Sequence, residues 1–170
     1  MAPATHPPES SLTTTVLPSA NIDTILRNTP HRFPFLLIDR IEACEPGKWV
    51  RVIRNVSAND ALLPKVPLAQ RVMPQMLIVE ALAQAAGSLC HYSGMMNTGR
   101  RSIMFFAGVD NCRFLRDVYP GDQVVLECTL KRAMRGVAKL VGTATVDGSL
   151  VLEADLTAVV RDIEPEPSLL

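Results

Sequence analysis

The longest apolar segment of the chain runs from Met76 to His91 and reads MLIVEALAQAAGSLCH. Its apolar residues fall on nearly every face of a helix, it contains no proline, and Ala, Leu, Met, Glu and Gln are strong helix formers. A helix that is hydrophobic all round is buried all round. The segment is also too short, and too interrupted by Glu80 and Gln84, to span a membrane. The pattern therefore predicts a central core helix that the rest of the chain wraps.

Strand-like patterns of alternating apolar and polar residues dominate the chain after this helix, and two more precede it. Three turn signals separate strands: Glu45-Pro46-Gly47-Lys48, Pro120-Gly121-Asp122 and Asp147-Gly148. The first suits a type II turn, and Asp-Gly is a strong hairpin signal. Strands joined by tight turns are antiparallel. The expected strands are Phe35–Cys44, Lys48–Val56, Ser102–Val109, a short piece near Cys112–Arg116, Gln123–Met134, Val137–Val146 and Leu150–Asp162.

These elements predict one α+β domain over residues 21–162, in which a curved antiparallel sheet of about five or six strands wraps the long helix. A short helix is expected over Asn21–Arg27, with Asn21 as its N-cap. Residues 1–20, rich in Pro, Ser and Thr, predict a disordered leader, and residues 163–170 a loose tail. One sheet cannot cover every face of such a helix, so we expect at least a dimer.

The composition excludes several classes of function. The formal net charge is zero, which argues against nucleic acid as a partner. The four cysteines are far apart and lack CxxC spacing, so they predict buried thiols in a reducing compartment and no metal site. The N-terminus lacks the basic start and apolar run of a signal peptide. We therefore expect a cytoplasmic protein without a membrane span.

Glu80 is the residue of the central helix that needs a functional explanation. Burying an unpaired carboxylate costs several kcal/mol or shifts its pKa strongly upward. Two interpretations stay open: a carboxylate tied to a backbone N–H or an arginine, and a catalytic acid or base.

Several long motifs, found in order along the chain, resemble the 3-hydroxyacyl-[acyl-carrier-protein] dehydratases of fatty acid synthesis. The resemblance covers residues 22–162, nearly everything outside the two tails. The motifs are PHRFPFLLIDRI, EPGK, RNVSAND, VMP followed by LIVEALAQAAG, FFAGVDNCRF, YPGDQVVLE and GTATVDGSLVLEA.

The resemblance implies the hotdog fold and a homodimer with a continuous sheet, often assembled into a hexamer as a trimer of dimers. It implies an acyl tunnel at the dimer interface and a substrate carried on the phosphopantetheine of acyl carrier protein or CoA, with no further cofactor. The family's chemistry uses a loop histidine and a helix carboxylate from opposite subunits, and an N–H group at a helix terminus holds the thioester carbonyl. Glu80 matches the carboxylate.

The loop before the helix departs from this pattern. Where the family reads Gly-His-Phe-Pro-Gly, the chain reads KVPLA, and Val66 stands in the place of the histidine. Gln75 replaces the glycine after the Met-Pro pair. Valine cannot carry a proton, and general acid–base catalysis contributes about 10²- to 10⁴-fold. Dehydration by a homodimer is therefore predicted to be impaired.

The resemblance also suggests residues that line the substrate site. They are Gln75, Met76, Gln84, Pro74, Val66 and His31. His31, in the segment PHRFPF, matches a histidine outside the family's catalytic pair and is interpreted as a hydrogen-bonded loop anchor. A replacement base at His31 would require the loop to be repositioned.

Four functions stay open. They differ in whether the chain is an enzyme by itself. The first is an acyl-thioester-binding subunit that completes a site with a histidine-bearing paralogue in a mixed dimer. The second is a thioesterase that uses Glu80 and the N–H near Gln75. The third is a non-enzymatic acyl-binding or scaffold protein, and the fourth a dehydratase with a rearranged site.

Overall fold

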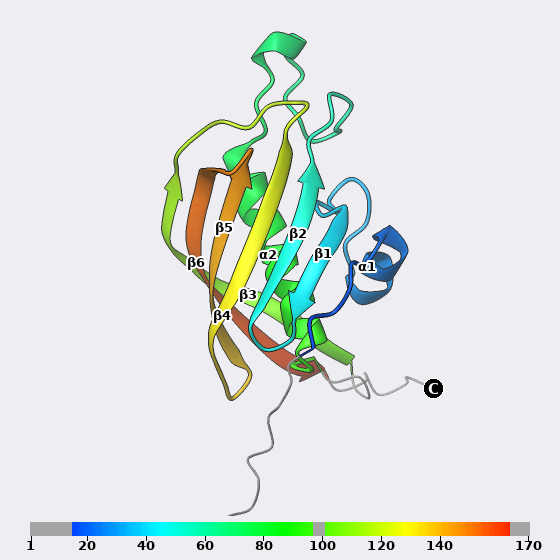
Figure 1. Ribbon diagram of the computed structural model, residues 1–170, viewed down its shortest axis with the longest axis vertical. Coiled ribbons are helices and arrows are strands. Elements are labelled where there is room, and N and C mark those ends of the chain that lie inside the picture. Colours follow the sequence, from blue (N-terminus) through cyan, green and yellow to red (C-terminus); the bar gives the residue numbers. More distant parts are fainter. Residues whose placement is uncertain (1–14, 97–100, 164–170) are drawn as a thin grey trace, which may run out of the picture.

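The computed structural model of the protein describes residues 15–96 and 101–163. Its helical elements are α1 (Ile22–Asn28), a short 3-10 helix (Leu68–Gln70) and α2 (Gln75–Tyr92). The strands are β1 (Arg40–Glu45), β2 (Trp49–Asn55), β3 (Arg101–Phe114), β4 (Gln123–Met134), β5 (Val137–Val146) and β6 (Ser149–Ile163). They form one six-stranded antiparallel sheet in the order β1-β2-β4-β5-β6-β3, which curves across α2 (Figure 1).

Most of the central helix is enclosed, whereas its apolar pattern predicts burial on every face and Met76 is 66% exposed. Ten of its residues are buried: Ile78, Val79, Ala81, Leu82, Ala83, Gln84, Ala85, Ala86, Leu89 and Cys90. On β5, a Cβ added to Gly142 would lie 3.3 Å from both terminal methyls of Leu82, so the glycine lets the helix approach the sheet closely. The α+β architecture of a curved sheet around one long helix is confirmed, and it is the arrangement of the hotdog fold.

Two of the predicted turns adopt the expected conformations. Gly47 has a φ of 77°, and the Lys48 N–H donates to the Glu45 carbonyl over 2.9 Å, as in a type II turn. Asp147 and Gly148 have φ values of 49° and 73°, which is the hairpin turn that Asp-Gly favours.

Two predicted strands differ from the structure. The stretch expected as two pieces is the single strand β3, because register shifts beside Gly108 and around Asn111 absorb the breaks in alternation while pairing with β6 continues. Strand β1 begins only at Arg40, although a strand was expected from Phe35. The segment before Arg40 crosses α2 instead, since the Gln84 side chain binds its backbone.

Residues before position 21 also pair with the sheet. Leu17 pairs with Cys44 and Ala20 with Ile41, so this segment covers the outer edge of β1. Backbone hydrogen bonds to a strand therefore replace the predicted disorder over residues 17–20. Residues 1–14, and the predicted tail from residue 164, lie outside the described residues. Asn21 caps α1 through its side chain, as predicted.

The cysteines are free thiols, three of them buried: Cys44, Cys90 and Cys128. Burial raises the pKa of Cys44 and of Cys90 to about 11, so these thiols stay protonated at neutral pH and pack as apolar groups. Within the described residues, no helix has the length and apolar character that crossing a membrane requires.

Large apolar side chains remain exposed on β3, at the edge of the sheet opposite β1. They are Phe105, Val109 and Phe114. An exposed edge strand with apolar side chains is a surface on which another chain can pair. The expected dimer stays a prediction, and this edge is the surface that favours it.

Two hairpin glycines provide a matched test of the sheet. Gly136 has a φ of 77°, and a Cβ there would lie 2.9 Å from the Val160 carbonyl oxygen. Gly148 has a φ of 73° with open space around it. We expect Gly148→Ala to lower the free energy of unfolding by about 1 kcal/mol through the left-handed backbone alone. Gly136→Ala should cost about 1–3 kcal/mol more, because Val160 must move. Urea denaturation measures both, and equal losses would contradict the close contact.

Candidate functional site

Glu80 lies in the second turn of α2, on the face that the sheet does not cover. Its side chain is 30% exposed, so it is half-buried in the single chain rather than enclosed as the sequence predicted. The sheet covers one side of the helix, and among the described residues the segment over residues 29–37 crosses the other side at Gln84, one turn after Glu80. Glu80 therefore lies at an opening, where a carboxylate can be both positioned and reached.

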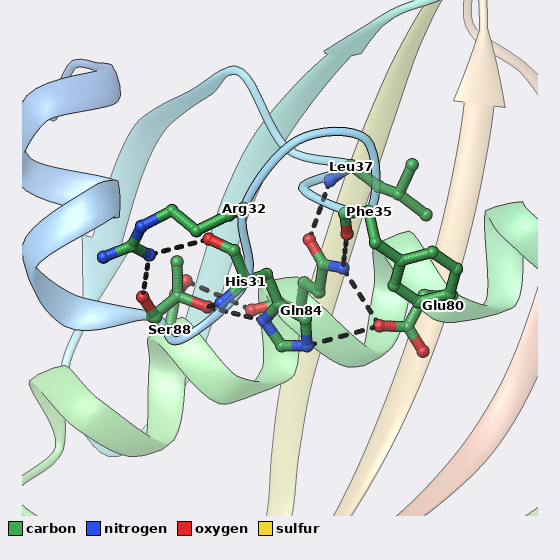
Figure 2. A network of polar contacts seen from close by, with 8 residues as sticks. His31, Arg32, Phe35, Leu37, Glu80, Gln84 and Ser88 are labelled. Carbon is green, nitrogen blue, oxygen red and sulfur yellow. Dashed lines mark hydrogen bonds and ion pairs between the residues drawn. The ribbon is translucent and has the colours of Figure 1, made fainter. Parts of the chain in front are cut away.

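Gln84, one turn after Glu80, fixes the position of the carboxylate. Its side chain is buried; the amide oxygen accepts from the Leu37 N–H over 2.9 Å, and the amide nitrogen donates to the Phe35 carbonyl over 2.8 Å. These two bonds assign the oxygen and the nitrogen of the side-chain amide. The second amide hydrogen then reaches Glu80 Oε1 over 2.9 Å (Figure 2).

His31 faces the same carboxylate, which the sequence did not predict. Its Nε2 lies 3.6 Å from Glu80 Oε1, within ion-pair range but beyond a hydrogen bond. The other ring nitrogen, Nδ1, lies 2.6 Å from the Thr29 hydroxyl. The sequence predicted that His31 would approach Glu80 only after its loop was repositioned; this is wrong, because the segment that Gln84 holds across α2 already carries His31 to the carboxylate.

Arg32 fixes the start of this crossing segment. Its guanidinium donates to the carbonyl of Leu26 in α1 and to the carbonyls of Thr29 and His31, at 2.7–3.0 Å. Sequence reasoning missed Thr29 and Arg32 as supports of the site. The signal was the compact polar cluster within TPHRFPF, next to the end of α1.

Both side-chain contacts of the Glu80 carboxylate within the described residues fall on Oε1. Figure 2 shows Gln84 and His31 approaching this oxygen, while Oε2 points away from both. A carboxylate held through one oxygen keeps the other available for a proton or a hydroxyl group. Among the described contacts, Glu80 therefore has one anchored oxygen, Oε1, and one oxygen without a side-chain partner, Oε2.

The beginning of α2 provides backbone donors near the carboxylate. Pro74 is the N-cap of the helix. The N–H groups of Gln75 and Met76 therefore belong to the first turn, where donors have no intrahelical partner. Met76 lies one turn before Glu80 on the same face, and it is 66% exposed. These N–H groups are suited to binding a carbonyl or an anion.

Val66 lies apart from this cluster. It is 37% exposed, in the loop between β2 and α2 that projects beyond the end of the sheet (Figure 1). The described partners of Glu80 come from residues 29–37 and from α2, not from this loop. Of the residues that the sequence singled out, the structure brings together Glu80, Gln84 and His31. No group of three or more His, Cys, Asp or Glu side chains within the described residues is arranged to hold a metal ion.

Removing the Gln84 amide tests how firmly the site is built. In Gln84→Leu the buried Leu37 N–H loses its acceptor and the Phe35 carbonyl its donor. We expect a loss of about 2 kcal/mol or more in the free energy of unfolding, since a buried unsatisfied group costs about 1–3 kcal/mol. Ser88→Ala is the matched control: the Ser88 hydroxyl donates only to the Gln84 carbonyl within the same helix, 3.1 Å away. A loss in Gln84→Leu no larger than in this control, measured by urea denaturation, would contradict the role of the amide.

Residues 29–155 match the model of the FabA-like domain family. Among solved structures of the same fold, a dehydratase heterocomplex, ApeI:P from Xenorhabdus doucetiae, aligns with a TM-score of 0.69 at 16% identity, over 79% of this chain and 89% of that one. A hypothetical thioesterase with coenzyme A from Streptococcus pneumoniae aligns with a TM-score of 0.56 at 15% identity, over 74% and 87% of the two chains. These likenesses confirm the hotdog fold.

Two curated relatives carry the name 3-hydroxyacyl-[acyl-carrier-protein] dehydratase FabZ. The protein of Thiobacillus denitrificans is 42% identical over 142 residues, which are 84% of this chain and 98% of the relative. The protein of Coxiella burnetii (strain RSA 331) is 45% identical over 139 residues, which are 82% and 98% of the two chains. The chain belongs to the FabA-like domain family and to the family of FabZ 3-hydroxyacyl-[acyl-carrier-protein] dehydratases of fatty acid biosynthesis.

Proposed function

We propose that the chain is an acyl-thioester-binding subunit of this dehydratase family whose own dimer dehydrates poorly. In this proposal Glu80 completes the site of a histidine-bearing hotdog partner. The observation that carries it is the contrast between the two halves of the site. Glu80 is held by Gln84 with one oxygen open, while Val66 stands where the family has its loop histidine.

The retained half of the site has the parts that a thioester substrate requires. The first-turn N–H groups of Gln75 and Met76 are donors for the thioester carbonyl. Pro74 begins the helix that presents them. The substrate is a 3-hydroxyacyl chain on the phosphopantetheine of acyl carrier protein or on CoA, and the protein requires no cofactor of its own.

The chemistry divides between two subunits. Dehydration removes a proton from carbon 2 and hydroxide from carbon 3 of the acyl chain, which gives a 2-enoyl thioester and water. Glu80 Oε2 donates the proton that the departing hydroxide needs, and the partner's imidazole takes the proton from carbon 2. Exchange with water then restores both groups.

A homodimer of this chain would hold two carboxylates and no loop imidazole. A mixed dimer would hold one complete site, built from Glu80 and the partner's histidine, and one site with Val66 in place of the histidine. Support for such an assembly comes from the same fold in ApeI:P, which is described as a dehydratase heterocomplex. A homodimer, or a trimer of dimers, is the family's usual assembly.

Two other functions each have an observation in their favour. The His31 Nε2, 3.6 Å from Glu80 Oε1, favours a dehydratase with a rearranged site in which His31 replaces the loop imidazole. A lone carboxylate beside a helix N-terminus favours a thioesterase, in which Glu80 activates a water molecule that attacks the thioester carbonyl. Both functions predict turnover by the chain alone.

The deciding experiment measures dehydration and thiol release from a 3-hydroxyacyl thioester. We expect Val66→His to raise dehydration by about 10²- to 10⁴-fold over the natural chain, because it returns a proton-carrying group to the loop. Adding Glu80→Gln should abolish this gain, whereas His31→Gln should leave most of it. Natural-chain dehydration as fast as that of Val66→His, lost in His31→Gln, would replace the proposal with the rearranged site. Thiol release abolished by Glu80→Gln would replace it with the thioesterase.

The mixed dimer has a separate test. The chain is co-expressed with a histidine-bearing hotdog subunit, and the purified mixed dimer is assayed for dehydration. Glu80→Gln should remove nearly all activity, while the corresponding amide substitution in the partner should remove little, because that carboxylate faces Val66. Equal effects of the two substitutions would contradict the crossed arrangement.

A further inference from the structure

The loop between β2 and α2 has an ordered tip that buries none of its own side chains. Residues 64–70 are all exposed, and they include Val66 and Leu68. The residues on either side, Leu63 and Met73, are buried. Core packing therefore fixes the two ends of the loop, and the 3-10 helix over Leu68–Gln70 shapes part of the tip, but neither ties the tip to the first limb of the loop.

Arg71 supplies the missing constraint. Its Nε donates to the Val66 carbonyl over 2.9 Å, and its Nη1 donates to the Ala58 carbonyl over 2.9 Å. One guanidinium thus joins the outgoing limb, the tip and the returning limb of the loop. A guanidinium stays charged and presents its donors in a rigid fork, so it can hold two carbonyl groups in a fixed relation.

The base of the loop is fixed independently. Arg54 and Asp60 form a buried ion pair, and the Met73 N–H donates to the Val118 carbonyl over 2.8 Å. The loop as a whole is therefore anchored without Arg71. What Arg71 adds is the position of the tip, and in particular of the backbone at Val66.

We propose that Arg71 is a positioning residue, whose guanidinium fixes the backbone of residue 66 where the loop meets a second hotdog subunit. The inference rests on the proposed function, in which the loop of one subunit approaches the carboxylate of another. A tip that is exposed, partly apolar and held in position by Arg71 is suited to contact with another chain. In the natural chain Arg71 presents valine at this place, and in Val66→His it would present an imidazole.

Limited proteolysis tests the bracing without any assumption about activity. Trypsin can cleave after Lys65, which is exposed in the tip. We expect Arg71→Ala to accelerate cleavage of the Lys65–Val66 bond about tenfold or more, because two hydrogen bonds from a charged donor are lost. Arg71→Lys, whose ammonium is a single point charge, should lie in between. Arg40→Ala, which removes an exposed arginine of β1, is the matched control. Unchanged cleavage in Arg71→Ala, with folding verified by circular dichroism, would overturn the inference.

Kinetics of the doubly substituted chain test the positioning. We expect Arg71→Ala to remove about 10- to 100-fold of the kcat that Val66→His gains, with a smaller change in KM, because a displacement of about 1 Å can cost 10²-fold. Arg71→Lys should restore part of the lost kcat. Full activity of Val66→His/Arg71→Ala, despite faster cleavage, would overturn the positioning role. A failure of Val66→His to gain dehydration would instead count against the proposed function, while the proteolysis result would stand.

Discussion

The site depends on the hydrogen bonds of one buried amide. Gln84 binds the backbone of the crossing segment at two points, Phe35 and Leu37, and the carboxylate of Glu80 at a third. Arg32 and the buried Leu37 side chain also hold this irregular segment, but the first two bonds are its polar contacts with the central helix at Phe35 and Leu37. Since the same segment carries His31, the amide also decides which groups face the carboxylate. The Gln84 side chain therefore contributes both to the fold, through the crossing segment, and to the site, through Glu80.

Much of the fold could be predicted because its signals are local. The apolar segment from Met76 to His91 predicted a core helix, although Met76 and Glu80 are not buried, and the Asp147-Gly148 turn predicted a hairpin within the sheet. The crossing segment could not be predicted in this way. Its apolar residues from Phe35 to Ile38 favour a strand, whereas the Gln84 side chain, 47 positions after Leu37, binds the backbone in place of a neighbouring strand. The pairing of Leu17 with Cys44 is similarly long-range.

The sequence predicted the carboxylate of the candidate site, but it did not predict which side chains lie around that carboxylate. Glu80 was conspicuous because a charge interrupts an apolar helix, and Val66 because the motifs around it match a family that has histidine there. That His31 lies 3.6 Å from Glu80 follows from three-dimensional folding and has no signature in the spacing of the two residues. The carboxylate is therefore less isolated than its sequence context indicates.

The N-terminal segment that pairs with β1 limits how these molecules can join side by side. An open sheet has two borders, and each unprotected border can recruit another chain. Here Leu17 and Ala20 occupy the β1 border, and β3 stands at the other. When the β3 edges of two chains pair, the two edges that remain are the β1 edges, and both are covered. Addition of further chains along the sheet therefore ends after one pair. The arrangement favours closed pairs over open-ended fibrils.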